Sequence, residues 1–353
     1  MGNVYTKSGA LAQRIYFGAT LIWEKATELY DLFKQRVLFD GGTFIENPIV
    51  FNDELLLLTP NAFKAGKLYS AVPNDGTGDF TVDRNSTATY IGQEGLIKNA
   101  VINEPRIDWS TGVPVVLREE QRTNLITYSE NIEHIAWFKN YITITTNEKI
   151  APDGLQTMDL IIPAVVNGRH YLANESSVTT GLYYTQTIFA ERGGYDFLKI
   201  VANRGFDNLF INVNLTNGTI GFKSTGINAI VTEFGNTYKI SVTLISTADS
   251  DTGRFLFLPL EFNENGLLPF TTGNGVDGIY LWGAQLEQAS TASSYIPTNG
   301  ATVTRLADNI SVPTPAGVTS ITETIGGIEQ TPITTIPATY SLPVGNINKV
   351  KMQ

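Results

Sequence analysis

Between residues 74 and 312 the chain is a succession of short runs rich in Val, Ile, Thr, Tyr and Phe. These runs cover 141–145, 183–189, 197–201, 209–213, 238–244, 255–260 and 278–282. Turn-forming triplets such as Arg192-Gly193-Gly194 and Thr216-Asn217-Gly218 separate them. Such runs are typical of β-strands, and their number and spacing favour two packed sheets. Because only 16% of residues are charged, amphipathic helices are disfavoured. We therefore expect an all-β protein with a jelly-roll β-sandwich over residues 74–312.

The N-terminal segment differs from this body. Two β-prone runs within 11–23 predict a small hairpin. In 24–38, apolar residues recur at helical spacing, namely Leu29, Leu32, Phe33 and Val37. The turn-rich segment 74–79 marks the next boundary. We expect a small module over 1–73 that consists of a hairpin and a helix.

The C-terminal segment is poor in charge and rich in Thr, Ile and Pro. From residue 309 onward its charged residues are Glu323, Glu329, Lys349 and Lys351. This composition favours ordered strands over disorder, and prolines place strands at sheet edges or in short segments. We expect a short C-terminal β-module over 313–353, completed by another chain.

Charge and cysteine content narrow the classes of partner. The formal net charge is -10 and no cluster of Lys and Arg occurs, so we expect no nucleic-acid partner. Cysteine is absent, which excludes disulfides and thiol nucleophiles. Apolar runs such as 55–58 are too short to span a bilayer, so we expect no membrane partner. The first residues show no export signal.

No catalytic constellation stands out. The two histidines, His134 and His170, form no metal-binding pair, and we expect structural roles for both. A nucleophile elbow and a phosphate-binding loop are missing from the sequence. Two carboxylate pairs, Glu119-Glu120 and Glu130/Glu133, could serve glycosidic acid–base chemistry, but solvated or arginine-paired carboxylates are favoured. We predict that the chain is not an enzyme.

Cofactors are not expected, with structural calcium as the alternative. Oxygen donors lie on turns at Asp75 to Asp79 with Asp83, and at Asp249 and Asp251. Neither group matches the twelve-residue calcium loop, and Asp-Gly is a common turn dipeptide. We predict no metal ligand.

Aromatic side chains are the remaining resource for binding. The chain has 4 Trp, 15 Tyr and 18 Phe. Tyr183, Tyr184 and Tyr195 lie on or beside predicted strands and are the candidate glycan-binding residues. Neighbours such as Tyr183 and Tyr184 face opposite sides of a strand, so one of them is expected in the core.

Residues 68–131 carry specific motifs. They include an Arg-x-Ser-x-Ala-Thr-Tyr core at 84–90, Gly-Leu-Ile at 95–97, Pro-Arg-x-Asp at 105–108 and Glu-x-Gln-Arg-Thr-Asn-Leu at 119–125. Ala136-Trp137, Ala151-Pro152-Asp153-Gly154 and YLWGAQLEQASTASSYIPTNGATVTRLADNIS at 280–311 continue the pattern. This layout, over about residues 66–312, resembles bacteriophage virion proteins, especially fibre and tail-associated proteins of phages that infect Bacteroidales.

The resemblance implies a jelly roll similar to carbohydrate-binding modules, and it brings no catalytic residues. It implies structural ion pairs among the motif arginines and neighbouring carboxylates, which are Arg84, Arg106, Asp108, Glu119, Arg122, Arg305 and Asp308. Such partly buried pairs would hold the loops of the sandwich in place.

The function implied is that of a virion structural protein, a head or tail fibre component, that displays the sandwich for attachment to host-surface glycans. A decoration or adaptor protein without glycan binding is the alternative, and a capsule depolymerase is the least favoured. Expected partners are other capsid or tail proteins and copies of the chain itself, as a homotrimer or else a dimer. The resemblance also implies that the module over 1–73 attaches the protein to the virion. The expected location is the virion, assembled in the bacterial cytoplasm.

The stretch 281–300 is interpreted as a clasp. Trp282 is expected in the last core strand, and 289–294 form a loop of small residues. Tyr295-Ile296-Pro297 is expected to return the chain to the sandwich.

Overall fold

The computed structural model describes residues 38–40, 43–45, 54–73 and 77–353. By its contacts the chain divides into two compact units, Met1–Glu54 and Leu55–Gln353. In the first, β1 (Leu38–Asp40) pairs with β2 (Thr43–Ile45) in antiparallel fashion. The predicted hairpin over 11–23 and helix over 24–38 lie outside the described residues, apart from Leu38, which begins β1.

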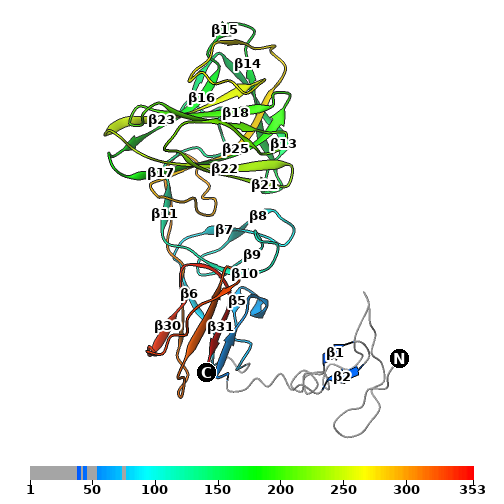
Figure 1. Cartoon of the computed structure of the whole chain (residues 1–353), viewed down its shortest axis with the longest axis vertical. Helices are drawn as coiled ribbons and strands as arrows, with labels where there is room; N and C mark the ends of the chain where they lie inside the picture. The colour runs from blue at the N-terminus through cyan, green and yellow to red at the C-terminus, as the bar shows by residue number, and fades with distance from the viewer. Residues whose placement is uncertain (1–37, 41–42, 46–53, 74–76) are drawn as a thin grey trace. The chain divides into compact units, whose positions relative to one another are not determined.

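Residues 138–287 of the second unit form a sandwich of two six-stranded sheets, drawn at the top of Figure 1. Sheet A has the order β12 (Phe138–Asn140), β16 (Tyr171–Val178), β23 (Ser250–Leu260), β18 (Phe197–Asn203), β19 (Leu209–Asn214), β20 (Ile220–Lys223). Sheet B has the order β13 (Ile142–Ile150), β14 (Gln156–Pro163), β25 (Gly278–Glu287), β17 (Tyr183–Gly193), β22 (Thr237–Ile245), β21 (Asn228–Phe234). Neighbouring strands in both sheets are antiparallel. A short pair, β15 (Asn167–Gly168) and β24 (Thr271–Thr272), lies beside them.

The core of the sandwich follows from the two-residue period of its strands. In β23, Phe255 and Phe257 belong to the central cluster, whereas Leu256 and Leu258 belong to a cluster on the other face. The central cluster draws from both sheets, with Leu198 and Ile200 from sheet A and Ile188, Ile240 and Leu281 from sheet B, among others. One shared core between two antiparallel sheets confirms the predicted all-β sandwich.

The outer face of sheet A is covered by residues 261–270, which connect β23 to β24. Lys199 anchors this cover, since its Nζ donates 2.8 Å to the carbonyl of Glu264 and also donates to the carbonyl of Gly266. Leu267 and Leu268 pack on the outer apolar cluster. Burial lowers the pKa of Lys199 to about 8.

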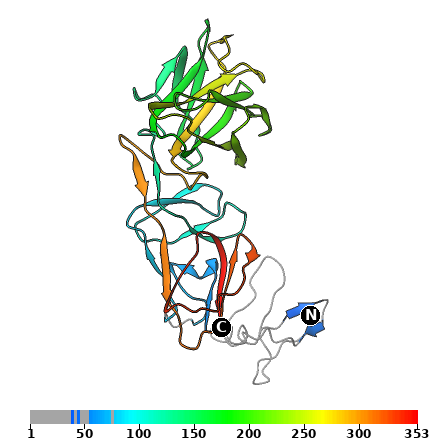
Figure 2. The ribbon, with the colours of Figure 1, turned by 60° about the vertical axis from the view of Figure 1, so that its left-hand side comes forward.

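The segments that flank the sandwich in sequence, 55–125 and 297–353, form what we call the flanking region. Its largest sheet has the path β29 (Ile328–Glu329), β28 (Ile321–Ile325), β31 (Gly345–Met352), β10 (Val115–Arg118), β9 (Arg106–Asp108), with β3 (Leu56–Leu58) also paired to β31. Figure 2 shows β3, in blue, beside β31, in red. A three-stranded sheet has the order β30 (Thr339–Ser341), β27 (Asn309–Pro313), β6 (Thr81–Asp83).

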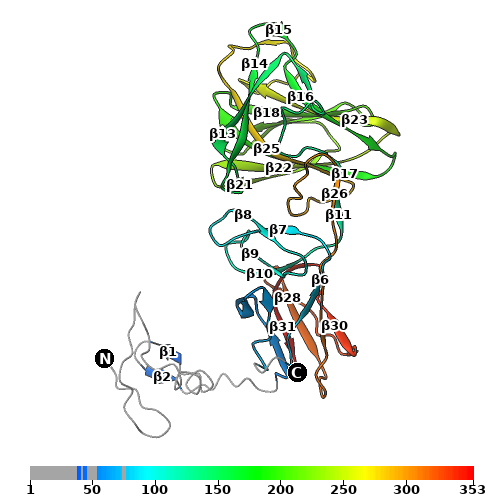
Figure 3. The same ribbon diagram turned by 180° about the vertical axis from the view of Figure 1, so that it is seen from behind.

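Short pairs complete the flanking region, as seen from behind in Figure 3. They are β7 (Ala88–Ile91) with β8 (Ile97–Ala100), β4 (Phe63–Lys64) with β5 (Lys67–Leu68), and β11 (Arg122–Asn124) with β26 (Val303–Arg305). A 3-10 turn, η1, covers Pro60–Ala62. The region has its own core, which includes Leu58, Val116, Ile310 and Val350.

The largest sheet of the flanking region combines strands from all three segments that the sequence analysis separated. β3 precedes residue 73, β9 and β10 lie within 74–312, and β31 follows 313. The boundaries at 73 and 312 stay a prediction about separately folding modules.

Candidate ligand-binding cleft

A hub of buried ion pairs lies within the flanking region, where it contacts the clasp. Arg84, Arg106 and Arg305 are each 0–1% exposed. Asp308 accepts from Arg84 Nη1 at 2.7 Å and from Arg106 Nη2. Glu119 accepts from Arg106 Nη1 at 2.7 Å and lies 3.4 Å from Arg305 Nη2. The structure therefore brings together five of the seven residues expected in structural ion pairs.

The other two of the seven lie elsewhere. Asp108 pairs with no arginine within 4.0 Å in the described residues, and accepts instead from the backbone N–H groups of Ile91 (2.7 Å) and Ser110 (2.9 Å). Arg122 has its Nε 4.0 Å from Glu287, at the edge of ion-pair distance. Asp108 thus orders backbone, not an arginine.

The arginines of the hub keep Glu119 ionised. Burial alone would raise the pKa of this carboxyl, but Arg106, Arg305 and a hydrogen bond from Ser294 lower it to about 2. The arginines also bind backbone carbonyls, as when Arg84 donates to Val101 and Glu104. Among the described residues, Arg305 Nε has no hydrogen-bond partner, so the hub is not fully satisfied. A buried ion-pair network in which most donors are satisfied still favours one geometry, whatever its net contribution to stability.

The hub holds the middle of the clasp, residues 288–296, against the flanking region. Ser294 donates from its backbone N to Glu119 Oε1 (2.9 Å) and from its hydroxyl to Oε2 (2.7 Å). Thr89 donates from its hydroxyl to the carbonyl of Tyr295. Trp282 and Tyr295 are buried, at 1% and 6% exposed, with ring centroids 4.7 Å apart. The buried Trp282 and the return of the chain at Tyr295 agree with the sequence interpretation.

A cavity of about 530 Å³, the first cavity, opens where the clasp meets β7, β9 and β21. Its lining includes the aromatic residues Tyr90, Trp109, Phe189, Phe234 and Tyr295 and the polar residues Asp108, Glu119, Glu233, Lys239 and Ser294. The volume lies in the range of roughly 300–1,000 Å³ that is usual for small-ligand sites. Aromatic and convergent polar groups in one concave site are what such sites require.

Trp109 is held in this cleft by its backbone. Its N–H donates 2.9 Å to the carbonyl of Ile91, while the N–H of Ile91 donates to Asp108. The residues on both sides of Trp109 are fixed as well, because Asp108 also accepts from Ser110. The Trp109 side chain remains only partly buried. A partly exposed indole on an ordered backbone is a suitable surface for a ligand ring.

Lys239 supplies a cationic donor to the same cavity. Its Nζ is 3.5 Å from the carbonyl of Ser293, a long hydrogen bond, and among the described residues no carboxylate lies within 4.0 Å of it. Burial lowers the pKa of Lys239, and the carboxylates of Glu119, Glu287 and Asp108 act in the opposite direction. Its ammonium group therefore has donor capacity left for a ligand oxygen.

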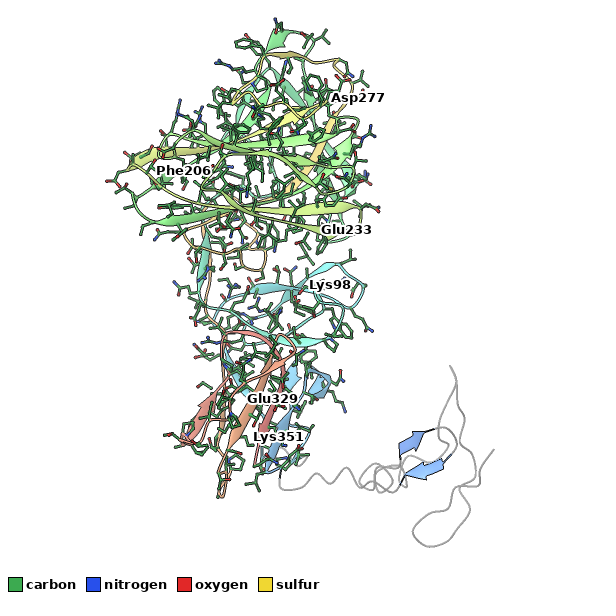
Figure 4. The ribbon with its side chains drawn as sticks, viewed as in Figure 1. Lys98, Phe206, Glu233, Asp277, Glu329 and Lys351 are labelled. Atoms are coloured by element: carbon green, nitrogen blue, oxygen red, sulfur yellow. The ribbon has the colours of Figure 1, made fainter. Side chains whose placement is uncertain are left out.

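A second cavity, of about 420 Å³, shares Tyr90 and Trp109 with the first. Its other lining residues include Pro60, Asn61, Phe63, Gln93, Glu94 and Lys98. Figure 4 labels Lys98 on β8 and Glu233 on β21, which line the second and the first cavity respectively.

Two of the three tyrosines proposed for glycan binding do not present a ring to solvent. Tyr184 is 2% exposed and belongs to the core, where its hydroxyl accepts from the N–H of Thr179. Tyr195 is 8% exposed and also packs in that core. For these two the structure corrects the expectation of a sugar-stacking ring, because Tyr184 occupies an inward-facing position of β17 and Tyr195, in the turn between β17 and β18, packs into the same core. Tyr183 is 47% exposed, outside both cavities, and its role stays a prediction.

The cleft residues Trp109, Lys239 and Phe234 were not among the sequence candidates. Trp109 directly follows the Pro-Arg-x-Asp motif, and this adjacency is a signal that could have pointed to it. Lys239 and Phe234 carry no such signal, since only the fold brings β21 and β22 next to residues 89–119.

The two histidines make structural contacts, and the acidic turns were considered as metal sites. His170 is 2% exposed, with Nδ1 2.6 Å from the carbonyl of Tyr141, and His134 stacks on Tyr128. Within the described residues, which omit Asp75, no group of three or more His, Asp or Glu could hold a metal ion. Calcium binding stays a prediction. No helix in the described part of the chain is long and apolar enough to cross a membrane.

Comparisons with known proteins found limited similarity. No protein-family model matches the chain, and no curated protein matches it. Among solved structures, the enzymatically active domain of tailspike protein 4 of bacteriophage CBA120 is 15% identical, with a TM-score of 0.27, over 46% of this chain and 21% of that one. A carbohydrate-binding module, TmCBM27, described for specific mannan recognition, is 9% identical, with a TM-score of 0.25, over 49% of this chain and 98% of that one.

The prediction that the chain is not an enzyme is corrected by this comparison. One of the structures it resembles is described as an enzymatically active domain. The likeness is too low to assign any activity to this chain. The lack of a catalytic motif in the sequence does not exclude catalysis.

Proposed function

We propose that this chain is a component of a bacteriophage virion that attaches to host-surface glycans through the first cavity. The observation that carries the proposal is the cleft itself, in which Trp109 and Tyr90 stand beside the donor Lys239 and the acceptor Asp108. The virion role is supported by the resemblance of residues 66–312 to phage fibre and tail-associated proteins.

The chemistry of the cleft suits a sugar. One face of a pyranose ring is made of C–H groups and packs well on an aromatic ring, and the hydroxyls at its rim both donate and accept hydrogen bonds. Trp109 offers the aromatic surface, and Lys239 offers donors. Glu233, exposed on β21, offers acceptors.

Glycan binding is tested on the purified chain with an array of host-surface oligosaccharides. We expect Trp109→Ala to raise the Kd about thirtyfold, the loss of about 2 kcal/mol that is usual for a buried aromatic anchor. Tyr183→Ala is the matched control, because Tyr183 lies outside the cleft. Binding that survives Trp109→Ala but is lost in Tyr183→Ala would move the site to the sandwich surface.

The virion role and the assembly state need separate tests. Antibody labelling of phage particles is expected to place the chain on the virion, on the head or the tail. Light scattering is expected to give a homotrimer, and a monomer at micromolar concentration would contradict that expectation. A chain found on virions that binds no glycan would support the decoration or adaptor role instead.

A further inference from the structure

We infer that the first and second cavities are two parts of one groove that binds an electrically neutral oligosaccharide chain. The inference rests on the proposed function and deepens it, because it specifies the length and the charge of the glycan. The two arguments, from shape and from charge, are independent of each other.

The shape argument starts from the residues common to both cavities. Tyr90 and Trp109 line the first cavity, of about 530 Å³, and the second, of about 420 Å³. Tyr90 lies on β7 between Thr89, which bonds to Tyr295, and Ile91, which bonds to Asp108 and Trp109. This strand therefore runs along the boundary of the two cavities. Each cavity alone has the size of a small-ligand site, so a ligand that fills both is a chain of several rings.

The second cavity offers the same kinds of group as the first. Asn61 and Gln93 supply amides, which both donate and accept hydrogen bonds, and Phe63 and Pro60 supply apolar surface. The charged pair in this cavity is self-neutralising, because Lys98 Nζ lies 2.6 Å from Glu94 Oε1. Sugar hydroxyls could replace water at these amides without disturbing a charge.

The charge argument concerns what a glycan carboxylate would meet. Proteins bind carboxylates best with arginine, which offers two parallel donors. The arginines next to the cleft, Arg106 and Arg305, are 0–1% exposed and already engaged with Glu119 and Asp308. The first cavity is lined by one lysine, Lys239, and by three carboxylates, those of Asp108, Glu119 and Glu233. An acidic sugar would therefore add a like charge without finding a free arginine.

The length of the glycan is tested on an array of neutral and uronic-acid-containing oligosaccharides of two to six units. We expect the bound ligands to be neutral, with the Kd falling about a hundredfold between the disaccharide and the chain long enough to fill both cavities. Equal affinity for disaccharide and hexasaccharide, or a preference for acidic chains, overturns the inference. No binding to any oligosaccharide contradicts the proposed function itself.

Variants in each cavity test separately what that cavity contributes to binding. Gln93→Ala combined with Asn61→Ala is expected to weaken binding of the longest ligand about tenfold and to leave disaccharide binding unchanged. Trp109→Ala is expected to weaken both. If the double variant has no effect on any length while Trp109→Ala still abolishes binding, the first cavity acts alone and only the extended groove is refuted.

Reversal of one exposed charge tests the selection by charge. Glu233 lies on β21 at the cavity and forms no ion pair within 4.0 Å in the described residues, so Glu233→Lys should fold normally. We expect this variant to bind acidic oligosaccharides at least tenfold more tightly than the wild type does. Unchanged affinity for acidic chains overturns the charge argument. Tyr183→Ala again serves as the control for a surface substitution outside the groove.

Discussion

Two buried carboxylates, one in the hub and one in the sandwich, meet opposite surroundings. Glu119 faces Arg106 and Arg305, and its pKa falls to about 2. Asp159 on β14 is 3% exposed and accepts 2.9 Å from the backbone N–H of Asn147, and burial raises its pKa to about 6. The sandwich is stabilised by apolar packing, and an ionised carboxylate inside it lowers its stability. The hub is held together by ion pairs, and its arginines need each of its carboxylates as a partner.

The largest effect is expected from removal of the central carboxylate of the hub. Asp308→Ala leaves Arg84 and Arg106 without their shared partner in a buried site, so we expect a loss of about 3–5 kcal/mol in the free energy of unfolding. Urea denaturation measures it. Glu120→Gln, which breaks the exposed pair with Arg118, is the control and should cost less than about 1 kcal/mol. Equal costs for both variants would show that the hub contributes no more than a surface pair.

The second effect is a pH dependence carried by Glu119. Since its folded pKa of about 2 lies below the ordinary value of 4.5, its stabilisation is complete above pH 4.5 and is lost as the pH falls toward 2. Glu119→Gln is expected to lose about 3 kcal/mol at pH 7, and the difference from wild type should shrink through that window. A difference that stays constant from pH 7 to pH 3 would contradict this.

The contribution of Asp159 to stability should change with pH in the opposite direction. The raised pKa of Asp159 means that the folded state holds a proton that the unfolded state releases, so stability falls as the pH rises from 3.8 to about 6. Asp159→Asn removes this loss and should be about 1 kcal/mol more stable than wild type at pH 7, after allowance for solvent screening. Below pH 4 the free energies of unfolding of Asp159→Asn and of the wild type should become equal. A variant that is less stable than wild type at pH 7 would contradict this sign.

The smallest expected effect on stability comes from Ser294, which bonds to the hub and lines the first cavity. Ser294→Ala removes the hydroxyl donor to Glu119 and should cost about 1 kcal/mol of stability. Ile200→Val in the sandwich core should cost a similar amount, about 0.5–1.5 kcal/mol. We expect only Ser294→Ala to raise the Kd for glycan, because Ser294 lines the first cavity. Equal effects of both variants on the Kd would mean that the clasp does not position the cleft.

The hub could be anticipated from the sequence in part, and the cleft hardly at all. The resemblance to phage fibre and tail-associated proteins implied ion pairs for the motif arginines Arg84 and Arg106. The role of Asp108 could not be anticipated, since choosing between an arginine and the N–H of Ile91 requires knowledge of how β7 lies against β9. Tyr184 illustrates a similar limit, because strand alternation does not tell which face of β17 is the buried one.

Local patterns were enough for the all-β class, the sandwich and the clasp at Tyr295. The reason is that strand period, turn residues and the scarcity of charge act over a few neighbouring residues. The cleft depends on the fold, because Trp109, Lys239 and Glu233 come from strands far apart in the chain and meet only when sandwich and flanking region are both formed. Distances between such residues are set by packing and by the hub, and no short stretch of sequence records them.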